Sequence, residues 1–456
     1  MRSLLQTASL ALGLWGASVR AIDVTWTDES SIKEAAGTIA YGLVKYYTGN
    51  NTGDVPGNLP DPYYWWEAGA MFGALIDYWW MTDDDSYNNI TSAGMLHQVG
   101  EDEDFMPTNQ TRTEGNDDQG FWAMAAMAAA ERKFPDPPDD EPQWLALAQA
   151  VFNEYASRWD TEHCDGGMRW QIFQFNSGYN YKNTISNGCF FNIAARLARY
   201  TGNDTYSDWA TKIWKWERGA GLITDAYKVY DGVTIGDTNC SSVDTAQWSY
   251  NAGIFLHGAS VMYNLTESST WKTRMDGMLS EIVTLFVKSD VIFEHFCEQT
   301  DQCNQDQQSF KGYLGRWLAA TSQMAPYTYE TIYPLLLSTA KAAVAVCTGT
   351  DSGFKGHSGT ACGFSWLTTT YDGLVGVGSQ MNAMSMVMYT LVKKGSTPVT
   401  SSTGGTSEGN ADAGNKNSDD VNKHQSKITT ADRAGAAIIT ILMCGGVLAG
   451  TAFVLA

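Results

Sequence analysis

The chain has 456 residues, and its 50 acidic and 29 basic side chains give a formal net charge of -21. A surface this acidic repels nucleic acid and acidic polymers, so we expect neither as a partner. The 17 Trp, 22 Tyr and 17 Phe suit a neutral sugar substrate, because flat rings cover the apolar faces of sugars, although most of these rings are expected to fill the core.

The N-terminal segment 1–21 predicts a signal peptide. Arg2 precedes an apolar stretch, and Val19 and Ala21 stand where a signal peptidase prefers small residues. We therefore expect a secreted protein whose mature domain begins at Ile22. Six sequons are possible glycosylation sites and predict surface positions: Asn50, Asn89, Asn109, Asn203, Asn239 and Asn264.

Two kinds of helical segment alternate along the chain. Six segments are apolar, rich in small residues and about 55 to 70 residues apart, a regular spacing that indicates a repeated supersecondary unit. Six amphipathic segments, charged on one face, lie between them. An inner ring of six apolar helices inside an outer ring of six amphipathic helices is an (α/α)6 toroid. We therefore predict an all-α toroidal domain over residues 22–395.

Several inner segments open with a polar or aromatic cluster followed by glycine, as in WWEAGA, NDDQGF and SYNAGI. Each cluster could simply cap its own helix. Because the clusters occupy equivalent positions, we expect them to converge at one end of the toroid and form a shared polar pocket. The candidate substrate-binding residues are Trp65, Glu67, Gln119, Asn187, Tyr250, Asn251 and Lys311.

The most informative stretch is EGNDDQGFW, residues 114–122, in which Asp117 and Asp118 are adjacent. Acidic residues favour a helix N-terminus, so the pair could serve only to cap the helix. One carboxylate is enough for that purpose, and the second either faces solvent or shares a cleft with the first. The neighbouring clusters favour the cleft.

Three motifs with this six-fold pattern, NDDQGFW, YYWWEAGAMFG and QSFKGYLGRW, resemble glycoside hydrolase family 76, the endo-acting α-1,6-mannanases. The resemblance covers residues 22–395. It implies that Asp117 is the nucleophile and Asp118 the acid/base. The signal peptide, sequons and C-terminal tail resemble the fungal cell-wall branch of that family, which is held by a glycosylphosphatidylinositol (GPI) anchor.

The spacing of the pair also bears on the chemistry. Retaining glycosidases hold their two carboxyl groups about 5 to 5.5 Å apart, and inverting ones about 6.5 to 9.5 Å. Adjacent Cα atoms are about 3.8 Å apart, so the shorter separation is the easier one to reach and retention is favoured. Since successive residues inside a helix do not face each other, we expect the pair on the non-helical turn before the helix.

Seven cysteines precede the C-terminal tail, an odd number for an oxidising compartment. Cys297 with Cys303 and Cys347 with Cys362 each bracket a short loop, so we predict two local disulfides. Cys189 lies in the apolar run GCFFNIAARLA and is the predicted buried free thiol. A third disulfide then joins the remaining pair, Cys164 and Cys240.

The C-terminal region divides into two parts. Residues 396–434 are polar and predict a linker that holds a GPI attachment site, at a small residue between Gly409 and Ser418. Residues 435–456 are apolar to the last residue, with nothing basic after them, which favours a removed GPI-signal tail over a membrane span.

Two hypotheses for the function follow. The first is a retaining mannan endo-1,6-α-mannosidase on the outer face of the plasma membrane or in the cell wall, tied to the membrane by a lipid anchor. Its substrate is α-1,6-mannan or the mannose-containing glycan of a GPI anchor, and with wall glucan as acceptor it acts as a transglycosylase. The second is a non-catalytic wall protein that binds mannan. Neither hypothesis requires a cofactor, and the histidines and cysteines predict no metal site.

Overall fold

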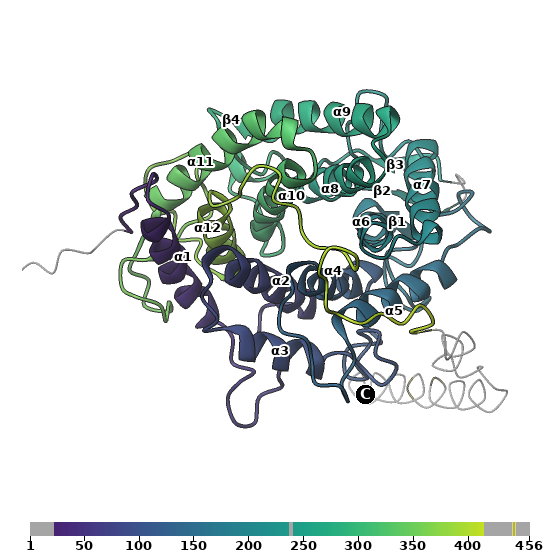
Figure 1. The fold of residues 1–456 in the computed structure, drawn as a ribbon, viewed down its shortest axis with the longest axis horizontal. Coiled ribbons are helices and arrows are strands. Elements are labelled where there is room, and N and C mark those ends of the chain that lie inside the picture. Colours follow the sequence, from purple (N-terminus) through teal and green to yellow (C-terminus); the bar gives the residue numbers. More distant parts are fainter. Residues whose placement is uncertain (1–21, 237–239, 415–439, 441–442, 444–456) are drawn as a thin grey trace, which may run out of the picture.

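The computed structural model describes residues 22–236 and 240–414, together with Thr440 and Met443. Within these residues the chain forms twelve α-helices in two concentric rings (Figure 1). This arrangement confirms the predicted all-α toroid. No helix among the described residues is long and apolar enough to cross a membrane.

The inner ring consists of every second helix. Contacts run from α2 to α4, α6, α8, α10 and α12 and back to α2, so the ring is closed. These helices are almost wholly buried because Ala, Gly and Met allow close packing on every side. Their bounds are α2 (Trp65–Thr82), α4 (Asn116–Arg132), α6 (Thr184–Thr201), α8 (Ser249–Thr266), α10 (Phe310–Met324) and α12 (Val377–Tyr389).

The outer helices pack against the inner ring with one face and leave the other in solvent, as their amphipathic sequences predict. Each precedes or follows an inner helix in the chain, which is why the two rings alternate. Their bounds are α1 (Glu29–Val44), α3 (Asn88–His97), α5 (Trp144–Ser157), α7 (Asp204–Gly219), α9 (Ser269–Leu285) and α11 (Tyr329–Ala345).

Short elements lie in the loops that connect the helices. One small antiparallel sheet has the order β1-β2-β3, and two hairpins pair β4 with β5 and β6 with β7. The strands are β1 (Tyr181–Asn183), β2 (Gly232–Thr234), β3 (Ser242–Asp244), β4 (Val287–Lys288), β5 (Val291–Ile292), β6 (Cys347–Gly349) and β7 (Ala361–Cys362). The 3-10 turns are η1 (Glu298–Thr300), η2 (Gln307–Ser309) and η3 (Pro326–Thr328).

Close contact between α4 and α6 depends on one glycine. A Cβ atom at Gly120 would lie 2.6 Å from the sulfur of Cys189 and 2.8 Å from the hydroxyl of Tyr155. Any side chain there would push the two inner helices apart. Because Gly120 lies just after Asp117 and Asp118, this contact fixes where the pair stands.

All predicted disulfides are present: Cys164–Cys240, Cys297–Cys303 and Cys347–Cys362. Among the described residues, Cys189 is the free cysteine and is buried, which is also as predicted. The first disulfide joins loops far apart in the sequence, and the other two close short loops.

A buried ion cluster ties four inner helices together near their C-terminal ends. Asp77 on α2 forms ion pairs with Arg132 on α4 and Arg316 on α10, and accepts a 2.6 Å hydrogen bond from the hydroxyl of Tyr389 on α12. Burial alone would raise the pKa of Asp77, but the two guanidinium groups hold it well below its ordinary value.

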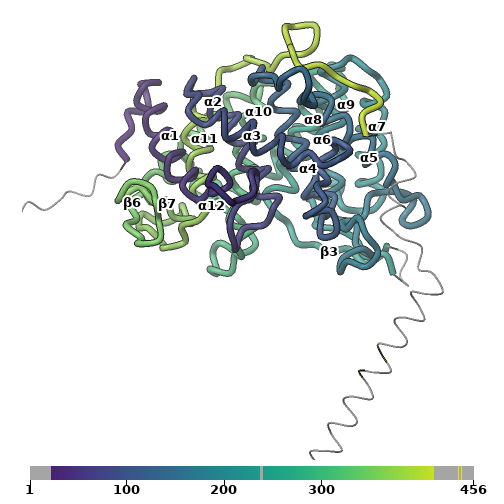
Figure 2. The backbone as a smooth tube through the Cα atoms, turned by 90° about the horizontal axis from the view of Figure 1, so that it is seen from below, coloured from purple at the N-terminus to yellow at the C-terminus, as the bar shows by residue number. Residues whose placement is uncertain are grey.

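Residues 396–414, which we call the C-terminal strap, cross the end of the barrel where the inner helices finish (Figure 2). The Val399 amide donates to the carbonyl of Glu131 at 3.0 Å, and the Ser407 hydroxyl accepts from the Leu145 amide at 2.9 Å. The sequence assigned the strap to a polar linker, whereas its backbone is fastened to α4, α5 and α6. The rest of the predicted linker and almost all of the apolar tail lie outside the described residues.

Candidate active site

A cavity of about 550 Å³ opens at the end of the barrel where the inner helices begin. Residues from the first turns of α2, α4, α6, α8 and α10, and from the loops that precede these helices, line it. The lining is aromatic and acidic and includes Tyr64, Trp65, Trp66, Glu114, Asp117, Asp118, Phe121, Trp170, Asn183, Asp231, Tyr250 and Asp306. Aromatic faces with a few polar groups between them suit a carbohydrate ligand.

Asp117 and Asp118 both line this cavity, so the structure brings the pair into the predicted cleft. Their position in the secondary structure differs from the prediction. Helix α4 begins at Asn116, which places both residues in its first turn and not on a non-helical turn before it. The expectation was wrong because side chains at an open helix end are not covered by a preceding turn, and both can point into the same cavity.

Asp117 is held in the form of a carboxylate. Its Oδ2 accepts a 3.1 Å hydrogen bond from the side-chain amide of Asn183, and its Oδ1 accepts from the Asp118 amide at 3.1 Å. Burial raises the pKa of Asp117 to about 6, and these hydrogen bonds limit the rise because they stabilise the charged form. Asp117 is therefore ionised at neutral pH.

Asp118, in contrast to Asp117, favours its protonated form. Its Oδ2 accepts a 2.6 Å hydrogen bond from the Gly115 amide, but burial and the neighbouring charge of Asp117 raise its pKa well above the ordinary value. Two close carboxyl groups do not ionise together, so one keeps its proton while the other is charged. The pair thus supplies a carboxylate and a carboxylic acid side by side, the two groups that glycoside hydrolysis requires.

Two more carboxyl groups enclose the same cavity. Asp231 accepts hydrogen bonds from the hydroxyl of Tyr181 at 2.7 Å and from the amide of Asn251 at 3.2 Å. Burial raises the pKa of Asp231 and that of Asp306. Acidic groups that are crowded in this way favour hydrogen bonds to neutral hydroxyl groups over the binding of an anion.

Two of the predicted substrate-binding residues line the cavity. Trp65 stacks on Trp122 with ring centroids 4.9 Å apart, and its indole nitrogen donates to Gln98 at 2.8 Å. Tyr250 stacks on Phe310 with centroids 3.8 Å apart and planes 5° apart. Trp122 lies behind the cavity wall, whereas Phe310 itself lines the cavity beside Tyr250. In both cases the stacked ring fixes the orientation of its partner.

The other predicted binding residues are fully buried and do not line the cavity: Glu67, Gln119, Asn187, Asn251 and Lys311. Each has partners inside the protein. Glu67 accepts from Gln305 at 3.1 Å, and Lys311 forms an ion pair with Glu298 at 3.0 Å. The inner helices do converge, but their polar clusters mainly hold the loops in place.

The remaining three of these residues support the site from behind. Gln119 donates to the carbonyl of Asp104 at 2.7 Å. Asn187 accepts from the Met168 amide at 2.8 Å and donates to the carbonyl of Asn183 at 2.9 Å. Asn251, as described above, orients Asp231. These contacts position the groups that line the cavity.

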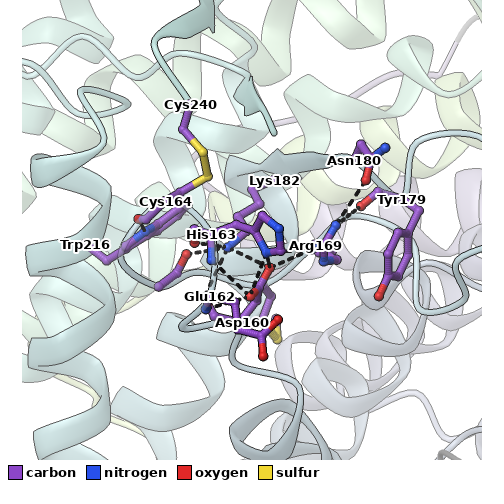
Figure 3. Close-up of polar contacts among 12 residues, drawn as sticks. Asp160, Glu162, His163, Cys164, Arg169, Tyr179, Asn180, Lys182, Trp216 and Cys240 are labelled. Carbon is purple, nitrogen blue, oxygen red and sulfur yellow. Dashed lines mark hydrogen bonds and ion pairs between the residues drawn. A yellow bond between two sulfur atoms is a disulfide. The ribbon is translucent and has the colours of Figure 1, made fainter. Parts of the chain in front are cut away.

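A polar cluster lies around Asp160, beside the Cys164–Cys240 disulfide (Figure 3). Asp160 lies between Arg169, at 2.8 Å, and Lys182, at 3.3 Å. Lys182 also donates to the carbonyls of His163 and Gly166, at 2.7 and 2.6 Å, next to the Cys164–Cys240 disulfide. The cluster anchors the loop that presents Trp170, so it shapes the cavity without lining it.

Several residues that line the cavity were not predicted from the sequence: Tyr64, Glu114, Trp170, Asn183, Asp231 and Asp306. Most lie in connecting loops, where no periodic pattern marks a residue as inward-facing. Asn183 carried a usable signal, since an Asn directly before an apolar helix is a typical N-cap. Glu114 stands in the quoted motif, but nothing in the sequence marks it as buried.

The chain is similar in sequence to known proteins over most of its length. The family model for glycosyl hydrolase family 76 matches residues 31–402. The chain is 47% identical over 425 residues to the mannan endo-1,6-alpha-mannosidase DCW1 of Saccharomyces cerevisiae, covering 93% of each chain. It is 42% identical over 442 residues to the mannan endo-1,6-alpha-mannosidase DFG5 of the same organism, covering 96% of this chain and 95% of the relative.

Solved structures share the architecture. Dfg5 from Chaetomium thermophilum, in complex with glucosamine, superimposes with a TM-score of 0.83 at 46% identity, covering 88% of this chain and 99% of that one. The GH76A α-1,6-mannanase of Salegentibacter sp. has the same fold at 17% identity, with a TM-score of 0.61 and coverage of 80% and 100%. The chain described here is therefore a glycoside hydrolase and belongs to glycosyl hydrolase family 76.

Proposed function

We propose that this glycoside hydrolase is an endo-acting mannosidase that cleaves α-1,6-linked mannose with retention of configuration. The observation that carries the proposal is that two adjacent carboxyl groups, Asp117 and Asp118, line one aromatic cavity, where burial raises the pKa of both. The names of the relatives, mannan endo-1,6-alpha-mannosidases at 40 to 47% identity, support mannan as the substrate. A protein that only binds mannan needs no acid beside a nucleophile, so the pair favours the enzyme.

In the first step the Asp117 carboxylate attacks the anomeric carbon of the mannose in the cavity. The bond from that carbon to the glycosidic oxygen breaks, and its electron pair stays on the oxygen, which takes the proton of Asp118. The products are a β-linked mannosyl ester on Asp117, a shortened glycan with a free hydroxyl, and an ionised Asp118.

In the second step the ionised Asp118 takes a proton from an incoming hydroxyl group, whose oxygen attacks the same carbon. The ester bond breaks and Asp117 leaves as a carboxylate. Water as the attacking group gives hydrolysis, and a sugar hydroxyl gives transfer. The second inversion restores the α configuration, so the enzyme ends in the state in which it began.

Transfer to a wall glycan is the second function that we propose, with a GPI glycan as donor and glucan as acceptor. It is favoured by the aromatic rim of the cavity, where Tyr64 and Trp170 are 62% and 36% exposed. Exposed rings beside a cleft offer apolar faces on which an acceptor sugar can stack and compete with water.

We also propose that the mature protein is secreted and held by a GPI anchor at the outer face of the plasma membrane or in the wall. The leader-like segment 1–21 and the uninterrupted apolar end at 435–456 support this proposal. A phospholipase that cleaves GPI anchors is expected to release the protein from membranes. If the released form still contains Cys444, the anchor assignment fails.

The activity is tested with a soluble chain of residues 22–414, which keeps the strap, and an α-1,6-mannotetraose substrate. Product analysis with and without a glucan oligosaccharide separates hydrolysis from transfer. Asp117→Asn and Asp118→Asn are each expected to lower turnover about a thousandfold without changing the melting temperature, since each removes an essential role. Turnover near the wild-type rate in either variant would place the chemistry elsewhere.

A further inference from the structure

A third carboxyl group stands directly before the catalytic pair in the chain. Glu114 is only 2% exposed and belongs to the lining of the same cavity. Neither of its carboxyl oxygens has a hydrogen-bond partner among the described residues. Buried polar groups are normally hydrogen-bonded, so a carboxyl without partners in a catalytic cavity needs a reason.

Glu114 favours its neutral form because it is buried. Three titratable groups face it: Asp118 on α4 and Asp104 in the preceding loop, which add negative charge when they are ionised, and Arg158 at the end of α5, which adds positive charge. Burial raises the pKa of Glu114 well above its ordinary value, Asp118 adds to the rise, and Arg158 does not cancel it.

Arg158 is already engaged elsewhere. It donates to Asn116 at 3.0 Å and to Gln119 at 2.6 Å, and it forms an ion pair with Glu154. Its charge is thus shared with the start of α4 and with another carboxylate. The pKa of Glu114 is therefore shifted toward the protonated form, which has an O–H group that it can donate.

The reaction creates a need for such a donor. When Asp118 gives its proton to the glycosidic oxygen, it becomes a buried carboxylate, and its hydrogen-bond donor in the described structure is the Gly115 amide. Burying a charge is costly unless further donors stabilise it. Glu114, one residue before Gly115, is the neighbouring group with an unused proton.

We propose that Glu114 is a positioning residue for the acid, which donates a hydrogen bond to Asp118 and stabilises the carboxylate formed there. The proton of Glu114 stays on Glu114 throughout, and the proton that Asp118 loses is the one gained by the leaving oxygen. The inference rests on the proposed function, in which Asp118 is the acid.

The chain contains a matched control. Glu217 on α7 is also fully buried, has both carboxyl oxygens without hydrogen-bond partners among the described residues, and has a pKa raised by burial. It does not line the cavity. A change at Glu217 therefore reports what altering a buried, partnerless carboxyl does to the fold alone.

The test uses the full chain, secreted and processed by its host, with the variants Glu114→Gln, Glu114→Ala and Glu217→Gln. Two substrates are compared: α-1,6-mannotetraose, whose leaving sugar needs a proton, and a dinitrophenyl α-1,6-mannobioside, whose leaving group does not. Melting temperatures confirm that each variant is folded.

The amide of Glu114→Gln still donates a hydrogen bond, so we expect its kcat on mannotetraose to stay within about threefold of wild type. Glu114→Ala is expected to lose about 30-fold in kcat on mannotetraose with little change in KM, and less than about threefold on the dinitrophenyl substrate. Glu217→Gln is expected to keep both activities.

Several results would overturn the inference. They are wild-type rates for Glu114→Ala on both substrates, equal losses on both substrates, or a Glu114→Gln variant as inactive as Asp118→Asn. Failure of the wild-type chain to cleave either substrate would instead refute the proposed function on which the inference rests.

Discussion

The side-chain amide of Asn183 donates a 3.1 Å hydrogen bond to Asp117, and the same side chain caps α6 by accepting from the Ser186 amide at 3.4 Å. One residue thus fixes the start of an inner helix and stabilises the charged form of Asp117, the proposed nucleophile, on the neighbouring helix. The hydrogen bond lowers a pKa that burial would otherwise raise further. The residue that caps α6 therefore also favours the ionised form of Asp117.

We predict that Asn183→Ala moves the acidic limb of the pH–rate profile to higher pH. In the wild type we expect this limb at about 6, because Asp117 must lose its proton before it can act as the proposed nucleophile. Without the amide the charged form is less stable, so the limb moves upward by about half a unit to one unit. The measurement is kcat/KM of α-1,6-mannotetraose between pH 4 and 8.

Asn183→Ser is the control for this prediction. A serine can still cap α6 but its side chain is too short to replace the amide at Asp117, so the melting temperature should recover while the limb stays shifted. A limb that returns to its wild-type position in the serine variant would mean that the cap, and not the hydrogen bond, sets the pKa.

The second prediction concerns stereochemistry. Neighbouring Asp residues in one helical turn can reach the short separation typical of retaining enzymes, so the first product from an α-mannoside should be the α anomer. Proton NMR early in the reaction, before mutarotation, identifies it. An initial β product would contradict attack by Asp117, even if the chain proves to be a mannanase.

The third prediction is that Glu67 affects stability and not turnover. Burial raises its pKa from 4.5 to about 8. A folded-state pKa above the unfolded value means that the folded chain binds more protons, so stability declines as the pH rises from about 4.5 to 8. Glu67→Gln cannot titrate, and its carbonyl oxygen can accept the same hydrogen bonds from Tyr64 and Gln305.

Relative to the wild type, Glu67→Gln should therefore gain about 3 kcal/mol in the free energy of unfolding between pH 5 and pH 7.5. Urea unfolding at the two pH values measures the difference. Turnover should remain within twofold. A large loss of turnover would support an alternative pair of Glu67 with Asp118, and equal stabilities at both pH values would refute the linkage argument.

The fourth prediction concerns the strap. A chain that ends at Ser396 loses the hydrogen bonds from the strap to Glu131, Leu145 and Gln149. These are three of nine hydrogen bonds that join the strap to α4, α5 and α6, so at about 0.5 kcal/mol net for each bond we expect the shorter chain to be about 4 to 5 kcal/mol less stable than a chain that ends at Gly414. Because the strap crosses the end of the barrel away from the cavity, kcat at low temperature should be unchanged. Equal unfolding free energies would show that the strap only rests on the surface.

The fifth prediction is that the sequon at Asn264 carries no glycan. Its amide nitrogen donates to the carbonyl of Met324 at 3.0 Å and its oxygen accepts from Arg199 at 2.9 Å, so both atoms are engaged in the fold. Asn109 is exposed and is the matched site at which we expect a glycan. Peptide mass spectrometry after enzymatic deglycosylation distinguishes the two. A fully occupied Asn264 would mean that glycosylation precedes the closure of this part of the ring.

The sequence by itself determined the ring of helices, the disulfides and the location of the Asp117–Asp118 pair. These features depend on local composition and on a regular period, and both can be read without knowing which surfaces meet. Only the tertiary structure decided which polar residues face the cavity. Glu67 and Lys311 have the same kind of sequence environment as Trp65 and Tyr250, yet their side chains bind to loops behind the cavity wall. The sequence could not predict this, because the loops that fill the space between helices have no periodic pattern. The protonation of the pair was likewise decided by the tertiary structure, because it depends on burial and on Asn183, which lies 66 residues further along the chain.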